Sequence, residues 1–218
     1  MLIINLDKNL NLVIHLKMSG QLIFKTKTKI NPAPNKSTRI IFLFNDLSQL
    51  WFSDYRTFGW IKLLSNNQVK AELANLGPEP LTKNFTSNYL KTIFLKTSRS
   101  IKLVLLDQQK IAGIGNIYAN EALFKAKILP SKPANKLKDR EIKALRSAII
   151  KTLQKAIKYK GSSAADQGYI QPDGSLGQYQ QHFLVYQQDG KKCQQCQTII
   201  KRIKLGNRGT FYCPKCQQ

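Results

Sequence analysis

The 218 residues carry 35 Lys+Arg against 12 Asp+Glu, which gives a formal net charge of +23 at pH 7. Because 42% of the residues are hydrophobic, the chain can bury a core, and disorder caused by low hydrophobicity is excluded. No apolar run approaches the roughly 18 residues that indicate a membrane-spanning helix. The first seven residues, MLIINLD, contain neither a basic segment nor a small-residue cleavage site, so we expect no secretory signal and a cytoplasmic location.

The positive charge is concentrated in the second part of the chain. Residues 1–90 hold 11 Lys+Arg and 5 Asp+Glu, whereas residues 91–218 hold 24 and 7. Such a field attracts polyanions, and binding that releases counterions from phosphates weakens steeply with salt. We therefore expect a nucleic acid as partner. Two alternatives are lysines that only solvate the surface and an anionic membrane, although no basic helix with an aromatic apolar face favours the membrane.

Residues 1–76 have the pattern of a β-sheet domain. Apolar and polar residues alternate in short segments, without helical periodicity, and this predicts an antiparallel sheet. The breaker cluster GPEPL at 77–81 marks the expected domain boundary. The expected strands lie at 2–6, 10–16, 22–24, 38–44 and 50–52.

Beyond this boundary the periodicity becomes helical, and the fold class that we predict is α+β. We assign residues 77–182 to a helical domain and residues 183–218 to a separate C-terminal module. Asp139 is the predicted N-cap of the last helix, whose apolar residues from Ile142 to Ile157 recur at helical spacing. The expected helices lie at 84–96, 100–106 and 140–160.

The segment DQQKIAGIGNIYANEAL at 107–123 combines two glycines with the start of a helix. Gly113 and Gly115 allow the backbone to approach a ligand, and a helix is predicted to begin just after Asn116. The free N–H groups and the positive dipole end of such a helix suit a phosphate. The segment lacks the third glycine of a dinucleotide-binding motif and the Gly-Lys-Ser/Thr of a P-loop, so it predicts neither.

All four cysteines follow the pattern C-x2-C-x16-C-x2-C near the end of the sequence. This spacing is typical of a zinc ribbon with four thiolate ligands, and we expect one structural Zn²⁺ without an open coordination position. Disulfides are the alternative in an exported protein, and a redox pair would be expected near a βαβ unit. The predicted ligands are Cys193, Cys196, Cys213 and Cys216.

Between the cysteine pairs, residues 199–212 alternate apolar and basic side chains and then reach the sequence Gly206-Asn207-Arg208-Gly209. The pattern predicts a β-hairpin with Arg208 at its tip. An arginine between two glycines can approach a phosphate closely, whereas the alternative is a turn that only faces solvent.

With these motifs in this order, the chain resembles the formamidopyrimidine-DNA glycosylase family, two-domain bacterial base-excision repair enzymes. The resemblance covers essentially the whole chain. It implies a partial N-terminal antiparallel β-sandwich, a helix–two-turn–helix domain and a four-cysteine zinc ribbon. The motifs that carry it are HLKMSG at 15–20, DYRTFG at 54–59, the segment 107–123, and the zinc hairpin ending in TFYC at 210–213.

The resemblance implies roles for individual residues. Asn116 and Arg208 would bind backbone phosphates beside the damaged nucleotide, and Arg208 would also act in the second elimination step. Met18, Arg56 and Phe58 match a wedge that fills the gap left by a flipped base. Physical chemistry agrees, since apolar and aromatic side chains can replace the lost base stacking.

Further expectations follow from the same resemblance. Lys102 lies where the family has a basic residue facing DNA, and residues 168–175 match a loop that closes over the flipped base. Glu121 lies inside the helix motif, where we expect it to cap or orient rather than react. The implied partner is double-stranded DNA that contains an oxidised purine or an abasic site. We expect the protein to act as a monomer and to bind no membrane.

The sequence departs from the family pattern at three places. The family opens with Pro-Glu-Leu-Pro-Glu, in which the proline amine is the nucleophile, the adjacent glutamate moves protons and a later lysine assists; this sequence starts after those elements. Lys17 replaces a glycine, and residues 36–39 lack the family's histidines. We therefore weigh a fragment of a working glycosylase and AP lyase against a protein that binds damaged DNA without excising the base.

A third hypothesis is a basic zinc-ribbon protein that binds RNA. It accounts for the charge and for the cysteines, but not for the GNIYA sequence or for the ordered wedge residues. The lesion preference stays open at this stage, because it depends on the geometry of the base pocket.

Overall fold

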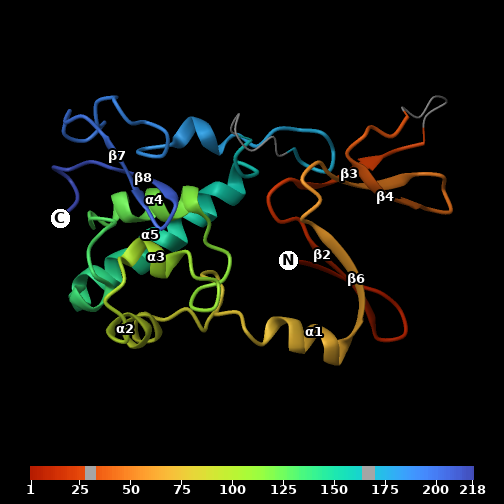
Figure 1. Cartoon of the computed structure of the whole chain (residues 1–218), viewed down its shortest axis with the longest axis horizontal. Helices are drawn as coiled ribbons and strands as arrows, with labels where there is room; N and C mark the ends of the chain where they lie inside the picture. The colour runs from red at the N-terminus through yellow and green to blue at the C-terminus, as the bar shows by residue number, and fades with distance from the viewer. Residues whose placement is uncertain (28–32, 164–169) are drawn as a thin grey trace. The chain divides into compact units, whose positions relative to one another are not determined.

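The computed structural model describes residues 1–27, 33–163 and 170–218, which form two compact units (Figure 1). Unit 1 comprises residues 1–74 and 159–180, and unit 2 comprises residues 75–158 and 181–218. Among the described residues, no helix is both long enough and apolar enough to span a bilayer.

Unit 1 contains two three-stranded antiparallel sheets, which confirms the predicted all-antiparallel β domain. One sheet has the order β1-β2-β6 and the other β3-β5-β4. The side chains of Val13, Ile14, Trp51 and Phe52 are buried. The strands are β1 (Leu2–Asn5), β2 (Leu10–His15), β3 (Gly20–Lys25), β4 (Thr38–Leu43), β5 (Gln49–Asp54) and β6 (Trp60–Ser65).

The chain leaves the sheets through helix α1 (Asn66–Leu73), which sequence analysis did not predict. A capping box begins it: the Ser65 hydroxyl accepts from the Gln68 N–H, and the Gln68 side chain accepts from the Ser65 N–H. None of its residues is buried, and its sequence therefore has no apolar face from which helical periodicity could be recognised. The signal that could have found it is the Ser-x-x-Gln spacing at 65–68.

Unit 2 is built around a helical core. Its apolar side chains form one hydrophobic cluster, in which Phe94, Leu105, Leu123 and Leu145 are almost fully buried. Helix α5 carries its basic residues on the exposed side, as the periodicity predicted. The helices are α2 (Ser87–Leu95), α3 (Ile101–Leu105), α4 (Asn116–Lys125) and α5 (Asp139–Lys158), with the short 3-10 turn η1 (Ala134–Lys136); a second 3-10 turn, η2 (Tyr179–His182), spans the boundary between the two units.

The start of α5 differs from the prediction by one residue. Asp139 is the first helical residue, and the carbonyl of Lys138 accepts the first helical hydrogen bonds, from Glu141 N at 2.9 Å and Ile142 N at 3.0 Å. The Glu141 carboxylate in turn accepts from the Lys138 N–H at 2.8 Å. Lys138 therefore takes the N-cap position, and Asp139 contributes through the helix dipole instead.

The compact units divide the chain differently from the predicted ranges 1–76, 77–182 and 183–218. Residues 159–180 belong with the sheets, because the Phe24 N–H donates to the carbonyl of Pro172 over 2.8 Å. The zinc module belongs with the helices, because buried side chains of α4 bind its backbone. Both groupings depend on contacts between residues far apart in sequence.

Candidate nucleic-acid interface and metal centre

The four cysteines meet at one point in unit 2, and their Sγ atoms all lie within 4.8 Å of one another. The Sγ atoms of Cys193 and Cys216 are 3.9 Å apart, and those of Cys196 and Cys213 are 3.4 Å apart. These distances exclude disulfides, and they approach the roughly 3.8 Å edge of a tetrahedron with Zn–S bonds of about 2.3 Å. The residues therefore fit one structural zinc ion, as predicted.

Gln217 connects this metal centre to the helices. Its side-chain oxygen accepts from the Cys213 N–H at 2.9 Å, and its side-chain nitrogen donates to the Ile128 carbonyl at 2.8 Å. The residue is 2% exposed, so both bonds are shielded from water. Ligand geometry and helix packing are thereby coupled through one buried amide.

The hairpin between the cysteine pairs consists of β7 (Lys201–Leu205) and β8 (Arg208–Tyr212). Its two-residue turn is Gly206-Asn207, with φ values of 51° and 61°, as a type I′ turn requires. Arg208 is thus the first residue of β8, paired with Leu205, and it is not at the tip. The prediction placed the turn two residues too wide, but Arg208 remains exposed.

The hairpin meets the start of α4 at Gly209. The Asn116 side-chain nitrogen donates to the Gly209 carbonyl over 3.2 Å, and Lys102 Nζ donates to the same oxygen over 2.7 Å. Asn116 is the first residue of α4, and Gly115 is its N-cap. Three residues predicted for DNA binding, Asn116, Lys102 and Arg208, are therefore gathered within one part of unit 2.

The backbone before α4 is open to an approaching group. Gly113 has a φ of 82°, and a Cβ atom built on either Gly113 or Gly115 would meet nothing within 4 Å. The N-cap supplies no side chain that hydrogen-bonds the first-turn N–H groups. Such exposed N–H groups at the positive end of a helix favour an anion.

Lys102 has a different surrounding from the one predicted. It is 0% exposed, and its ammonium donates to the carbonyl of Gly209 and to the hydroxyl of Thr210 at 2.8 Å. Burial, with a smaller contribution from the positive charge of Arg208, lowers the pKa of Lys102 to about 7. In the structure the Lys102 side chain is therefore buried against strand β8 of the hairpin and does not face solvent.

Glu121 fixes the segment that leads into the zinc module. Its buried carboxylate accepts from the backbone N–H groups of Leu184, Val185 and Tyr186 at 2.9, 3.0 and 2.9 Å. Burial raises the pKa of Glu121, although these hydrogen bonds oppose the rise. The expectation that Glu121 orients rather than reacts agrees with this geometry.

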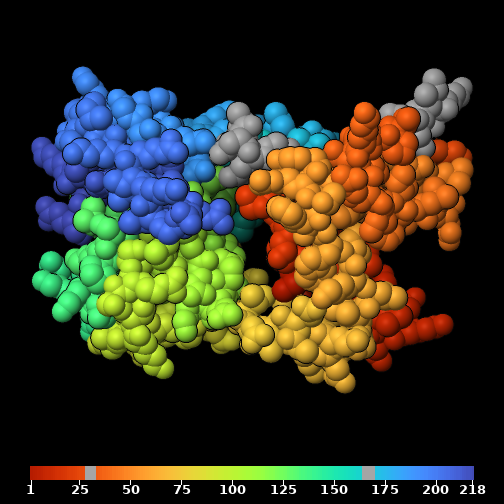
Figure 2. Space-filling view, in the orientation of Figure 1, coloured from red at the N-terminus to blue at the C-terminus, as the bar shows by residue number. Residues whose placement is uncertain are grey.

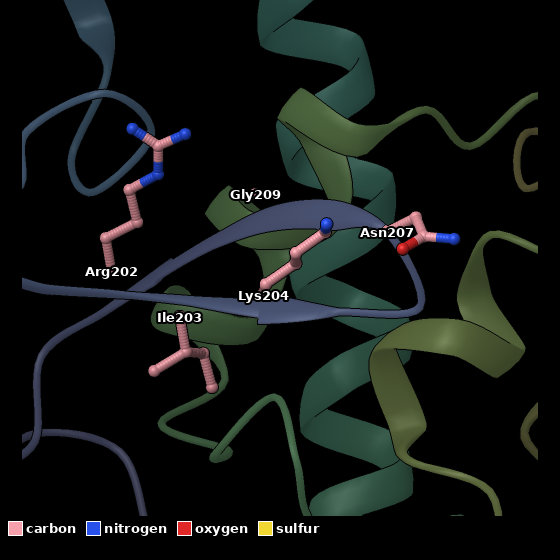
Figure 3. Close-up of a pocket in the computed structure, with 5 residues that line it drawn as sticks. All are labelled: Arg202, Ile203, Lys204, Asn207 and Gly209. Carbon is pink, nitrogen blue, oxygen red and sulfur yellow. The ribbon is translucent and has the colours of Figure 1, made fainter.

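Two further cations on the hairpin were missed by the sequence analysis. Arg202 and Lys204 extend from one side of β7 and Ile203 from the other, around a cavity of about 390 Å³ (Figure 3). Gly209 lies opposite Lys204 and leaves this space unfilled. The alternation of basic and apolar residues that predicted the strand is also the signal that places both cations on one face.

The Arg202 guanidinium lies 5.5 Å from the ring centroid of Phe211, an attractive cation–π geometry. In the space-filling view, the residues of the zinc module form an exposed surface beside those of the helices of unit 2 (Figure 2). Exposed cations and a nearby helix N-terminus make this part of unit 2 suited to a phosphate backbone.

The predicted wedge residues lie together in unit 1. Met18 is in the turn between β2 and β3, and Arg56 and Phe58 are in the loop between β5 and β6. Met18 is 57% exposed and Phe58 is 60% exposed, and the Arg56 guanidinium lies 5.8 Å from the Phe58 ring centroid. The solvent-exposed side chains of Met18 and Phe58 are therefore available to contact a partner.

Lys17, beside Met18, has a φ of 50°. Residues with a side chain are strained in this left-handed region and glycine is not, so Lys17 adopts a backbone conformation that favours glycine. The predicted base-covering loop at 168–175 is only partly visible, because Gly168 and Tyr169 lie outside the described residues.

Known proteins with similar sequences agree with this architecture. The model of the formamidopyrimidine-DNA glycosylase N-terminal domain matches residues 1–61, and that of the family's H2TH domain matches residues 76–167. The zinc finger found in FPG and IleRS matches residues 190–218.

Formamidopyrimidine-DNA glycosylase of Bacillus subtilis is 40% identical over 208 residues, covering 94% of this chain and 74% of that protein. The enzyme of Wolbachia sp. subsp. Drosophila simulans is 40% identical over 213 residues, covering 98% of this chain and 77% of that protein.

Solved structures show the same relationship. Lactococcus lactis Fpg in complex with abasic-site DNA is 37% identical, with a TM-score of 0.88, covering 97% of this chain and 76% of that one. MutM (Fpg) from Thermus thermophilus is 35% identical with a TM-score of 0.88, covering 99% of this chain and 78% of that one. This chain therefore belongs to the formamidopyrimidine-DNA glycosylase family.

Proposed function

We propose that this protein acts in base-excision repair of oxidised purines, and that this chain forms the DNA-binding and base-flipping part of a DNA glycosylase with AP lyase activity. Its substrate is duplex DNA, which it binds at the damaged nucleotide while the base is flipped out of the stack. The observation that supports this most directly is the meeting of Asn116, Lys102 and the Arg208 strand at the Gly209 carbonyl.

Asn116 and Arg208 hold phosphates beside the lesion in this proposal. The exposed N–H groups of α4 add partial positive charge, and Arg208 offers a planar pair of donors that suits a phosphate. In the second elimination the departing group is a phosphate, and a guanidinium held against it stabilises the developing charge. Buried Lys102 acts on the hairpin and not on the DNA directly.

Met18, Arg56 and Phe58 act on the bases. Removing a base from the stack costs a few kcal/mol, and apolar side chains that enter the gap offset part of that cost. The Arg56 guanidinium can donate hydrogen bonds to the base left without its partner. Their exposure on two adjacent loops supports this assignment.

The test compares this chain's affinity for a duplex with an abasic-site analogue and for the matching undamaged duplex, by fluorescence anisotropy at several salt concentrations. We expect tighter binding to the abasic duplex, and we expect Arg208→Ala to weaken it and to lower the slope of log K against log salt by about 1. Equal affinity for both duplexes would overturn lesion recognition. Tighter binding to single-stranded RNA would favour the zinc-ribbon RNA-binding alternative.

A further inference from the structure

Asp54 is a buried carboxylate to which the proposed function assigns no part. It is the last residue of β5 and is 1% exposed. A charge removed from water in this way is stable only when hydrogen bonds satisfy it. What satisfies it therefore shows which parts of the chain it holds.

The strand pairing brings two loops together around Asp54. The turn at 16–19 joins β2 to β3, and the loop at 55–59 joins β5 to β6. His15 pairs with Trp60 in one sheet, and Gly20 pairs with Asp54 in the other. Both connections therefore cross from one sheet to the other at the same place.

The carboxylate binds both connections. Its Oδ1 accepts from the Ser19 hydroxyl, in the turn, and from the Arg56 N–H at 3.2 Å, in the loop. Its Oδ2 accepts from the Gly59 N–H at 2.6 Å, at the end of the loop. The Ser19 hydroxyl oxygen also accepts from the Arg56 N–H at 3.1 Å, which closes a small network.

Close packing around this network leaves little freedom. A Cβ on Gly59 would lie 2.7 Å from the Phe52 ring and 3.0 Å from Asp54 Oδ2, and one on Gly20 would lie 2.5 Å from the Leu16 carbonyl oxygen. The hydrogen bonds hold the pKa of Asp54 below its ordinary value, although burial alone would raise it. The carboxylate is therefore charged and fully bonded in neutral solution.

The exposed residues on these two loops are Met18, Arg56 and Phe58. Each is next to a residue that the network fixes, or belongs to it: Met18 precedes Ser19, Arg56 donates its own N–H, and Phe58 precedes Gly59. Side chains that are arranged before binding lose less conformational entropy when they bind. The wedge residues come from two separate loops, so a bond between the loops is needed to fix their relative positions. A wedge built from a single loop would not need such a bond.

We propose that Asp54 is a positioning residue that joins the turn at 16–19 to the loop at 55–59, so that Met18, Arg56 and Phe58 enter DNA as one preassembled wedge. This inference rests on the proposed function. It assigns the Asp and the Gly of the DYRTFG sequence to the assembly of the wedge, and it assigns no contact with DNA to either of them.

The test uses Asp54→Asn, which removes the charge and replaces one acceptor oxygen by a donor. The readout is the fluorescence of 2-aminopurine placed opposite an abasic site, which rises when the wedge unstacks it, together with the affinity ratio for abasic over undamaged duplex. We expect both the fluorescence rise and the affinity ratio to fall about tenfold, as in Phe58→Ala. Asp46→Asn is the matched control, because Asp46 makes the same kind of bonds to Ser48 in another turn of unit 1.

A double variant separates positioning from general stability. If Asp54 acts through the wedge, Asp54→Asn adds little to the loss already caused by Phe58→Ala, because the two residues then share one effect. Fully additive losses would overturn the proposal. If Asp54→Asn does not fold, as judged by thermal unfolding, Ser19→Ala replaces it; this variant removes one donor to the carboxylate and one acceptor of the Arg56 N–H and keeps Asp54 itself.

The outcomes distinguish this inference from the function on which it rests. Wild-type protein without any preference for the abasic duplex would mean that the proposed function fails. A preserved preference and fluorescence rise in Asp54→Asn, with a wild type that shows both, would overturn the positioning role alone.

Discussion

The side-chain oxygen of Asn120 accepts a hydrogen bond from the main-chain N–H of Phe211 over 2.9 Å, and Asn120 is fully buried. Helix α4 and strand β8 are thereby joined at their centres. The Asn116 contact with Gly209 lies one helical turn earlier on the same face of α4. The hairpin and the first turns of α4 are therefore joined into one hydrogen-bonded element.

Lys204→Ala should weaken binding to duplex DNA and lower the slope of log K against log salt by about 1, because one phosphate contact is lost. The matched control is Lys201→Ala, which removes the same charge from the same strand. Lys201 and Lys204 are an odd number of residues apart on β7, so their side chains point to opposite faces. Equal slopes in the two variants would contradict the assignment of the Arg202–Lys204 face to DNA.

Removal of the metal by a chelator should release one zinc ion per chain and loosen the module over 193–217. Hydrogen exchange should accelerate at the N–H groups of β7 and β8 first, and next at the Cys213 N–H, which donates to the Gln217 side chain. Binding to abasic DNA should weaken in parallel and return when zinc is added. Unchanged exchange in the hairpin after complete metal release would exclude a structural role for the ion.

Glu121→Ala should destabilise unit 2 by about 3 kcal/mol or more, because three buried N–H groups lose their acceptor. Urea unfolding monitored by circular dichroism measures the change. Glu72→Ala is the control, because it breaks an exposed ion pair with Lys62, of a kind worth roughly 1 kcal/mol or less. Similar losses in both variants would contradict the role given to Glu121.

The stability of the protein should depend on pH through Lys102. Its pKa is about 7 in the folded chain against an ordinary value of 10.5, so between these values the unfolded chain binds more protons at this site. The free energy of unfolding attributable to this residue therefore rises with pH over that window. Lys102→Met lacks this contribution.

Urea unfolding of zinc-loaded wild type and Lys102→Met at pH 7, 8 and 9 measures the effect. Other titrating groups cancel in the difference between the two proteins. The free energy of wild type relative to the variant should increase with pH, and a flat or falling difference would show that the lysine is charged throughout.

Much of this fold could be predicted from short-range patterns. Period-two alternation identified strands β1 to β5 of unit 1 but not β6, helical spacing identified α5, and the cysteine spacing identified the metal ligands. The strand and helix signals repeat every few residues, the cysteine signal lies within residues 193–216, and each reflects which side chains must be buried or must share one ion.

The remainder depends on contacts that no local pattern contains. A lysine is ordinarily expected at the surface, so the sequence did not predict that Lys102 is buried. Its partner, the carbonyl of Gly209, lies 107 residues further along the chain. The same holds for Asp54, whose acceptor role requires the register of two different sheets. The position of Arg208 was wrong by a short distance, because Gly206-Asn207 alone completes the turn.

The division of the chain into units determines what a single proteolytic cut does to the folded protein. The polypeptide passes from one unit to the other after Ala74, Lys158 and Gln180. A protease that cuts one of these connections yields two fragments on a denaturing gel. Whichever connection is cut, at least one unit contains segments of both fragments, and the packing inside that unit holds the fragments together. Nicked molecules should thus migrate as intact ones under native conditions.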